Sequence, residues 1–117
     1  MSPTIVLDEN NQFFMATGSP GGSTIITYVA KTLIGVIDWG LDAQQATSLA
    51  NFGSTNGSTF IEEERLADEA TIVSELEAMG HSVDVRSRTS GLATIVSDGE
   101  TLVGGSDPRR EGVAKGD

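Results

Sequence analysis

The chain has 117 residues, of which 38% are hydrophobic and 5% aromatic, so it can form one small domain with a mainly aliphatic core. Its 17 acidic and 7 basic side chains give a formal net charge of −10, which argues against nucleic acid and anionic membranes as partners. The sequence has no cysteine and a single histidine, His81, which excludes disulfides, thiolate chemistry and histidine-rich metal sites, and we expect no cofactor.

The first third predicts a hairpin followed by a long helix. Two apolar runs, residues 3–7 and 12–17, flank the turn sequence DENN and read as paired strands. After a glycine-rich segment, apolar residues recur three and four positions apart from Ser23 to Trp39, which predicts a buried helix that ends at Gly40. The expected buried face consists of Ile25, Ile26, Val29, Ala30, Leu33, Val36 and Ile37. Gly35 predicts close packing within this helix, and Trp39 is expected to cap the core.

The rest of the chain predicts two more helices and several short strands. Asp42 and Gln45 have the spacing of a capping box, which predicts a helix over residues 43–49. A loop over 50–59 and a short strand from Thr59 should precede a third helix, capped by Asp68 and closed by Gly80. Its expected apolar face is Ile72, Leu76 and Met79.

Strands are expected again at the C-terminal end. Residues 82–87 alternate in polarity, and residues 92–96 and 101–105 flank the turn sequence SDGE as a second hairpin. Strands thus lie at both ends and helices in the middle, which predicts an α+β fold with helices on a largely antiparallel sheet. Residues 1–117 are interpreted as one domain or a fragment; Met1 is either a true start or an internal boundary of a longer protein.

The segment TGSPGGSTII, residues 17–26, has two interpretations. The first N–H groups of a helix have no partner inside it, and Gly21 and Gly22 have no Cβ to keep a ligand away. Their amides could form an oxyanion hole, since the P-loop lysine and the dinucleotide spacing of glycines are absent. From spacing alone, a strand-to-helix turn that needs glycine for its geometry is the favoured interpretation.

The sequence offers no convincing nucleophile. His81 follows Gly80 at a helix end, where a solvated loop residue is the simpler interpretation. Ser2 could act as an N-terminal nucleophile after removal of Met1, but Pro3 and the first strand follow directly. Residues 61–65, IEEER, read as a solvated acidic edge rather than as a carboxylate metal site. Trp39 and Phe52 could alternatively line a pocket.

Five blocks of the sequence carry a family resemblance. In order, MSPTIV, TGSPGGSTIIT, VIDWGLDAQQAT, LEAMGHSV and GGSDPRREGVAKGD resemble the C-terminal part of the small subunit of γ-glutamyltransferases (γ-glutamyltranspeptidases). The resemblance implies part of the αββα sandwich of an N-terminal nucleophile hydrolase. It also implies that Gly21 and Gly22 supply oxyanion-hole amides, in reversal of the interpretation from spacing. The variable region Ala50 to Ser58 departs from many relatives and leaves acceptor preference open.

The same resemblance implies that other parts of the site lie outside this chain. The family's nucleophilic threonine and a pair of serines that bind the substrate carboxylate precede the block that matches MSPT. The implied partners are a γ-glutamyl substrate such as glutathione, the rest of the small subunit and the large subunit, in a periplasmic or secreted setting. Arg109 and Arg110 are interpreted as structural residues that brace the C-terminal segment through ion pairs.

Two other functions stay open: a binding module for small anions without catalysis, and a relative that acts on cephalosporin side chains. A purely structural domain is a further alternative. If the chain is a fragment, uncovered apolar surface should lead to self-association.

Overall fold

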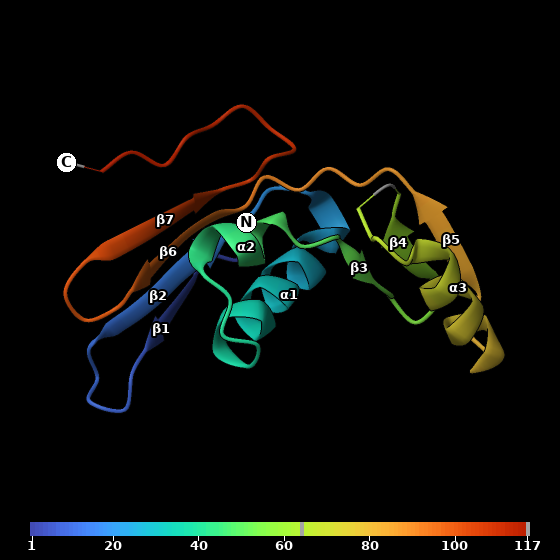
Figure 1. Ribbon diagram of the computed structural model, residues 1–117, viewed down its shortest axis with the longest axis horizontal. Helices are drawn as coiled ribbons and strands as arrows, with labels where there is room; N and C mark the ends of the chain where they lie inside the picture. The colour runs from blue at the N-terminus through green and yellow to red at the C-terminus, as the bar shows by residue number, and fades with distance from the viewer. Residues whose placement is uncertain (64, 117) are drawn as a thin grey trace. The chain divides into compact units, whose positions relative to one another are not determined.

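The computed structural model describes residues 1–63 and 65–116, and the chain divides into two compact units (Figure 1). The first unit comprises Met1–Leu49 together with the chain from Thr89 onward, and the second comprises Ala50–Arg88. That the whole chain forms one domain or fragment stays a prediction. None of the helices in the described ranges is long and apolar enough to cross a membrane.

The first unit is built on a four-stranded antiparallel sheet with the order β1-β2-β6-β7. Its strands are β1 (Thr4–Leu7), β2 (Phe13–Gly18), β6 (Ala93–Ser97) and β7 (Leu102–Ser106). Both predicted hairpins are therefore confirmed. The first turn is fixed by Asp8, whose carboxylate accepts hydrogen bonds of 2.8 Å from the amides of Asn10 and Gln12. Two local turn sequences thus set the outer pairs of the sheet, whereas the central pairing of β2 with β6 joins strands far apart in the chain.

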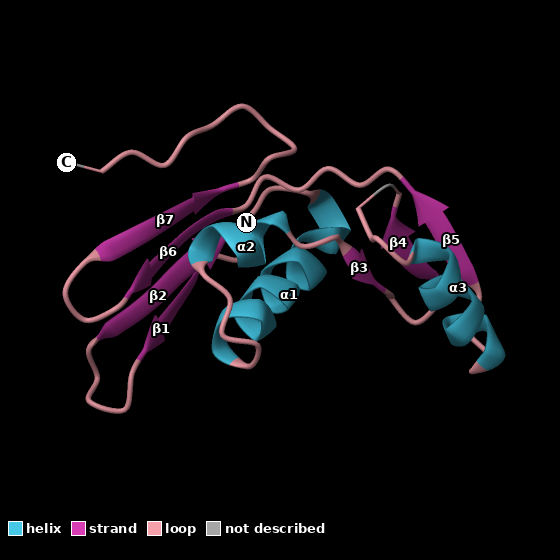
Figure 2. Cartoon of the chain, viewed as in Figure 1, coloured by secondary structure: helices cyan, strands magenta, loops and turns pink. Residues whose placement is uncertain are grey.

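Two helices pack on one face of this sheet (Figure 2). A 3-10 turn, η1 (Gly22–Thr24), leads into α1 (Ile25–Ile37), and α2 (Ala43–Ser48) follows. The predicted capping box is present at the start of α2, where the Asp42 and Gln45 side chains each bond the other residue's backbone N–H. Gly35 lies against α2 as expected, because a Cβ there would be 3.0 Å from Leu49 Cδ1.

The core lies between the helices and the sheet, around Met15, Val36 and Ala46. The face of α1 that enters it differs from the predicted one. Its buried residues are Tyr28, Val29, Lys31, Thr32, Gly35 and Val36. Ile26 is 71% exposed and Ile37 52% exposed, so the prediction that both are buried is wrong. Small residues on α1 allow α2 to approach its backbone closely, which turns the larger isoleucines outward.

The opposite face of the sheet is apolar and partly exposed. Ile5, Ala16, Ile95 and Gly104 pair in register across the four strands and therefore share a face. Ile5 and Ile95 are exposed there. The C-terminal segment also lies on this face, since a Cβ at Gly104 would be 2.8 Å from Ala114 Cβ.

The second unit contains a separate small sheet with the order β3-β4-β5 and one helix. Its elements are β3 (Phe52–Gly53), β4 (Thr59–Glu62), α3 (Glu69–Ala78) and β5 (Val83–Arg86). β3 and β4 are antiparallel, whereas β4 and β5 are parallel and are connected through α3. A second sheet with a parallel pair is a departure from the single, largely antiparallel sheet that the sequence predicts.

The start and the apolar face of α3 also differ from the prediction. Asp68 occupies the N-cap position, but its side chain makes no capping hydrogen bond. On the predicted apolar face, Ile72 and Leu76 are half-buried, whereas Met79 is 68% exposed, so the prediction is wrong for Met79 alone. The predicted end is confirmed, because the Gly80 amide donates to the Glu77 carbonyl.

Candidate functional site

The glycine-rich segment forms a connection between β2 and α1 whose backbone conformation only glycine adopts easily. Gly21 has φ 142° and Gly22 has φ 63°, both in the region that favours glycine. A Cβ at Gly21 would lie 2.6 Å from Cε2 of Tyr28, whose ring is buried on α1. A Cβ at Gly22 would meet nothing within 4 Å. Gly21 is therefore fixed by packing, whereas Gly22 is open to approach from outside.

Three successive carbonyl groups in this connection are hydrogen-bonded. Ser19 Oγ donates to the Pro20 carbonyl at 2.7 Å, and Thr24 Oγ1 donates to the Gly21 carbonyl at 2.8 Å. The amide of Ile25 donates to the Gly22 carbonyl as the helix begins. The peptide planes at Gly21 and Gly22 are thus held by two side-chain hydroxyls, which the sequence analysis did not single out. A short polar residue stands two positions before and two positions after the glycine pair, but such residues are common beside glycine in turns and give no distinct signal.

The loop before β6 supports the same connection. The Gly91 amide donates to Ser19 Oγ at 3.1 Å. A Cβ at Gly91 would lie 2.7 Å from Pro20 Cγ and 2.9 Å from Arg110 Cδ, so this glycine is packed between the two residues. Any side chain at this position would displace Pro20 or Arg110.

The C-terminal DPRR block anchors that loop. Asp107 accepts hydrogen bonds from Ser90 Oγ at 2.5 Å and from the Leu92 amide at 2.9 Å. Its carboxylate also forms a buried ion pair with Arg109, with Oδ1 and Nη1 3.1 Å apart. Arg110 Nε donates to the Ser90 carbonyl at 2.9 Å. These contacts confirm the predicted ion pair for Arg109, whereas Arg110 braces the segment through a carbonyl group.

Asp107 is held in its charged form. Burial raises the pKa of this carboxyl, but hydrogen bonds from Ser90, Leu92 and Arg109 outweigh burial and leave the pKa below its usual value of 3.8. The buried carboxylate is therefore a fixed negative charge at neutral pH.

The end of α2 receives two cationic side chains. Arg109 Nη2 donates to the Leu49 carbonyl at 2.7 Å, and Arg109 Nη1 donates to the Thr47 carbonyl at 3.4 Å. Lys31, which is buried in α1, donates to the same two carbonyl groups. Positive charge at a helix C-terminus is favourable. The apolar periodicity predicts a buried face on α1 without Lys31, because no local pattern indicates that this lysine is buried.

The other residues that the sequence analysis considered have no contact with Gly21 or Gly22 among those described. His81 is exposed in the second unit, as predicted, with Nδ1 3.5 Å from Thr59 Oγ1. Ser2 and Trp39 are exposed, and the expectation that Trp39 caps the core is wrong.

The run at residues 61–65 is only in part the solvated edge that the sequence predicts, since Glu63 and Arg65 are exposed. Ile61 and Glu62 are buried, and Glu62 accepts a hydrogen bond of 2.7 Å from the Asn51 amide. Glu64 lies outside the described residues. Within residues 1–63 and 65–116, no group of three histidine, aspartate or glutamate side chains could hold a metal ion.

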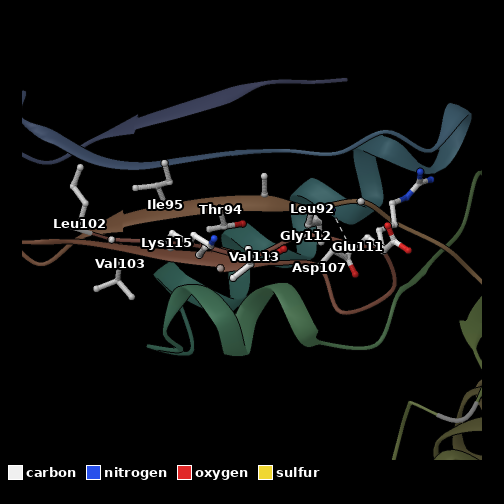
Figure 3. A pocket seen from close by; sticks show the side chains of 18 of the residues that line it. Leu92, Thr94, Ile95, Leu102, Val103, Asp107, Glu111, Gly112, Val113 and Lys115 are labelled. Carbon is white, nitrogen blue, oxygen red and sulfur yellow. Dashed lines mark hydrogen bonds between the residues drawn. The ribbon is translucent and has the colours of Figure 1, made fainter.

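A separate hollow lies elsewhere in the first unit. It is an open groove of about 1060 Å³ between β6, β7 and the C-terminal segment, lined by residues such as Thr94, Glu111 and Lys115 (Figure 3). The side chains of Leu102 and Val103 point away from each other there, as neighbours on a strand do. The groove does not include Gly21 or Gly22, and its lining suggests no chemistry.

Comparisons with known proteins assign the chain to a family. A family model described as Gamma-glutamyltranspeptidase matches residues 1–117. The glutathione hydrolase proenzyme of Escherichia coli is 37% identical over 111 residues, which are 93% of this chain and 19% of that protein. The chain thus spans about a fifth of the length of that relative.

Similar solved structures include γ-glutamyltranspeptidases, in agreement with the family model. A mutant γ-glutamyltranspeptidase of Helicobacter pylori superimposes with a TM-score of 0.83 at 32% identity, over 94% of this chain and 61% of that one. A cephalosporin acylase of Bacillus halodurans has a TM-score of 0.75 at 26% identity, over 86% of this chain and 19% of that one. The fold is therefore the α+β fold of N-terminal nucleophile hydrolases.

The family model identifies one family among the proteins that share this fold. The chain belongs to the γ-glutamyltranspeptidase family. Its homologues are enzymes, named as glutathione hydrolases or γ-glutamyltranspeptidases.

Proposed function

We propose that this chain is part of a γ-glutamyltransferase, in which it supplies two oxyanion-hole amides. The proposed enzyme transfers the γ-glutamyl group of glutathione or a related amide to water, an amino acid or a peptide through an acyl-enzyme intermediate. The single observation that carries the proposal is the connection at Gly21 and Gly22. This connection has positive φ at both glycines, is fixed by hydrogen bonds and precedes α1, in a chain whose family model matches from end to end.

The chemistry needs such a feature because negative charge develops on the carbonyl oxygen when a nucleophile attacks the γ-glutamyl amide. Backbone N–H groups that already point at this oxygen stabilise the charge without reorganisation. Removal of one such donor typically lowers kcat by about 10²–10³-fold. The dipole of the 13-residue helix α1 adds partial positive charge at the same end.

The nucleophile in this proposal is an N-terminal threonine that this chain does not contain. Residues outside the chain also hold the α-amino and α-carboxylate groups of the substrate. The proposed partners are therefore the remainder of the small subunit and the large subunit of one precursor. We expect the isolated chain to be inactive, and we expect a periplasmic or secreted location from the family resemblance.

The experiment compares two proteins in the release of p-nitroaniline from γ-glutamyl-p-nitroanilide. One is the 117-residue chain alone, and the other is the chain extended by its upstream reading frame and produced with the large-subunit segment. Activity only in the extended protein supports the proposal. Enzyme-like activity of the isolated chain would contradict it, because the chain would then contain its own nucleophile. A reading frame without an upstream threonine would favour the small-anion binding module instead.

A second candidate function uses a different acyl donor, a cephalosporin side-chain amide. The likeness to a cephalosporin acylase at 26% identity favours it, since the same oxyanion hole could serve a cephalosporin side-chain amide. The extended protein is assayed with γ-glutamyl-p-nitroanilide and with an acylated cephalosporin in parallel. The ratio of the two kcat/KM values decides between the donors.

A further inference from the structure

We infer that Ser19 and Thr24 are positioning residues, whose hydroxyls orient and strengthen the amide donors at Gly21 and Gly22. This inference rests on the proposed function and goes further, because it names the side chains that aim the oxyanion hole. Both lie in the first unit, on either side of the two glycines, and both are buried: Ser19 is 2% exposed and Thr24 is 8% exposed.

The geometry of a peptide unit couples the direction of each amide to that of a carbonyl group. The N–H of one residue and the C=O of the preceding residue lie in one plane and, in a trans peptide, point in opposite directions. The carbonyl that shares a plane with the Gly21 amide is that of Pro20, and the carbonyl that shares a plane with the Gly22 amide is that of Gly21. Whatever fixes these two carbonyls also fixes the direction of the two amides.

A hydroxyl holds each of these carbonyls. Ser19 Oγ donates to the Pro20 carbonyl at 2.7 Å, so the Gly21 amide points away from Ser19. Thr24 Oγ1 donates to the Gly21 carbonyl at 2.8 Å, so the Gly22 amide points away from Thr24. Without these bonds, residues with φ values of 142° and 63° would rotate more freely, because glycine allows many conformations.

The same bonds should strengthen the donors. A carbonyl that accepts a hydrogen bond polarises its peptide unit, which makes the attached N–H a better donor. Ser19 extends this chain by one step, since its Oγ accepts from the Gly91 amide at 3.1 Å while it donates to Pro20. The hydroxyl proton of Ser19 is therefore directed at the Pro20 carbonyl rather than shared between several acceptors.

The fold also keeps Ser19 and Thr24 in place. Gly91 packs against Pro20 and Arg110, and Arg110 Nε donates to the Ser90 carbonyl at 2.9 Å. Thr24 ends η1 and is the N-cap residue of α1, and the Ile25 amide is bonded to the Gly22 carbonyl. The hydroxyls thus belong to fixed elements on both sides of the connection, which is what orientation of a catalytic donor requires.

The test uses variants that remove a hydroxyl and keep the shape of the side chain. Thr24→Val and Ser19→Ala remove the proposed bonds, and Thr24→Ser restores the hydroxyl as a rescue. Thr27→Val is the matched control. Thr27 Oγ1 donates to the Thr24 carbonyl at 2.8 Å, which is the same kind of bond one turn later, but the amide of that peptide unit belongs to Ile25.

The first readout needs no activity. In ¹H–¹⁵N spectra of the 117-residue chain, Thr24→Val should shift the Gly22 amide proton upfield, and Ser19→Ala should do the same for Gly21. Thr27→Val should leave both unchanged, and Thr24→Ser should restore the Gly22 position. Equal effects of Thr24→Val and Thr27→Val on the two glycine amides would overturn the inference. If one variant does not fold, the other carries the test.

The second readout is kinetic and uses the processed, extended enzyme with γ-glutamyl-p-nitroanilide. We expect Thr24→Val and Ser19→Ala each to lower kcat by about tenfold or more at nearly constant KM, because the lost stabilisation acts in the transition state. If the wild-type enzyme is active and both Thr24→Val and Ser19→Ala have the same kcat as Thr27→Val, the inference is overturned. A wild-type enzyme without γ-glutamyl transfer would instead refute the proposed function, and the amide-proton shifts would still decide the positioning role.

Discussion

Substitution of the two adjacent glycines by alanine should have very different effects on stability. At Gly21 the new Cβ would lie 2.6 Å from Tyr28 Cε2 and 3.2 Å from Cδ2, at φ 142° and ψ 20°. The forbidden backbone conformation costs about 1–3 kcal/mol and the overpacking a further 1–3 kcal/mol or so. At Gly22 nothing lies within 4 Å and φ is 63°, so only a left-handed penalty of about 1–2 kcal/mol applies.

The assay is urea denaturation of the 117-residue chain and its two variants, followed by circular dichroism. We expect Gly21→Ala to lower the free energy of unfolding by about 2–6 kcal/mol, well above the loss in Gly22→Ala. In a Tyr28→Leu background the penalty at Gly21 should shrink, since the ring edge that the Cβ meets is gone. Equal losses in the two alanine variants, or an unchanged penalty in the Tyr28→Leu background, would refute this reasoning.

Three further results are expected from the first unit. Asp107→Asn should lower the free energy of unfolding by about 3–5 kcal/mol, because it leaves the buried Arg109 cation without its carboxylate; a loss no larger than in the exposed turn variant Asp98→Asn would contradict the ion pair. Since the folded pKa of Asp107 lies below 3.8, its contribution is present above that pH and is lost as the pH falls through the folded pKa, so wild type and Asp107→Asn should converge in stability in acid; a constant difference down to pH 2 or so would be inconsistent with this. Leu102→Lys should weaken self-association in sedimentation velocity, because Leu102 is exposed on the apolar sheet face opposite the helices; a strictly monomeric wild type at high concentration would rule out that association.

The elements that depend on neighbouring residues could be predicted from the sequence. The turns at DENN and SDGE, the capping box of Asp42 and Gln45, and the end of α3 at Gly80 all form as expected. In each case the hydrogen bonds join residues within a few positions of one another. Such bonds form for local reasons and need no knowledge of the rest of the fold.

The elements that depend on distant contacts were predicted less well. α1 carries apolar residues on more than one side, and periodicity does not tell which side meets α2; small residues such as Thr32 and Gly35 decided it, and Ile26 became exposed. The parallel pairing of β4 with β5 likewise depends on the crossover through α3 rather than on either strand alone.

In the candidate site, too, the local feature could be predicted from the sequence and the distant contacts could not. Gly21 and Gly22 were identified from their sequence block, and their catalytic role stays a prediction. The support behind them was not foreseen, because the Gly91 amide that bonds Ser19 lies 72 positions away in the chain. Short hydroxyl residues beside glycine are common in turns, so Ser19 and Thr24 carried no distinct signal before their carbonyl partners were known.

The most direct test of the central claim replaces the Gly22 amide by an ester in the extended enzyme, through incorporation of glycolic acid at this position. The change removes the N–H and leaves the backbone shape. The same change at Gly116, in the exposed C-terminal segment, is the control. An oxyanion-hole role predicts that kcat with γ-glutamyl-p-nitroanilide falls by about 10²–10³-fold while KM stays nearly constant. A kcat equal to that of the Gly116 control would contradict the claim that this chain stabilises the oxyanion.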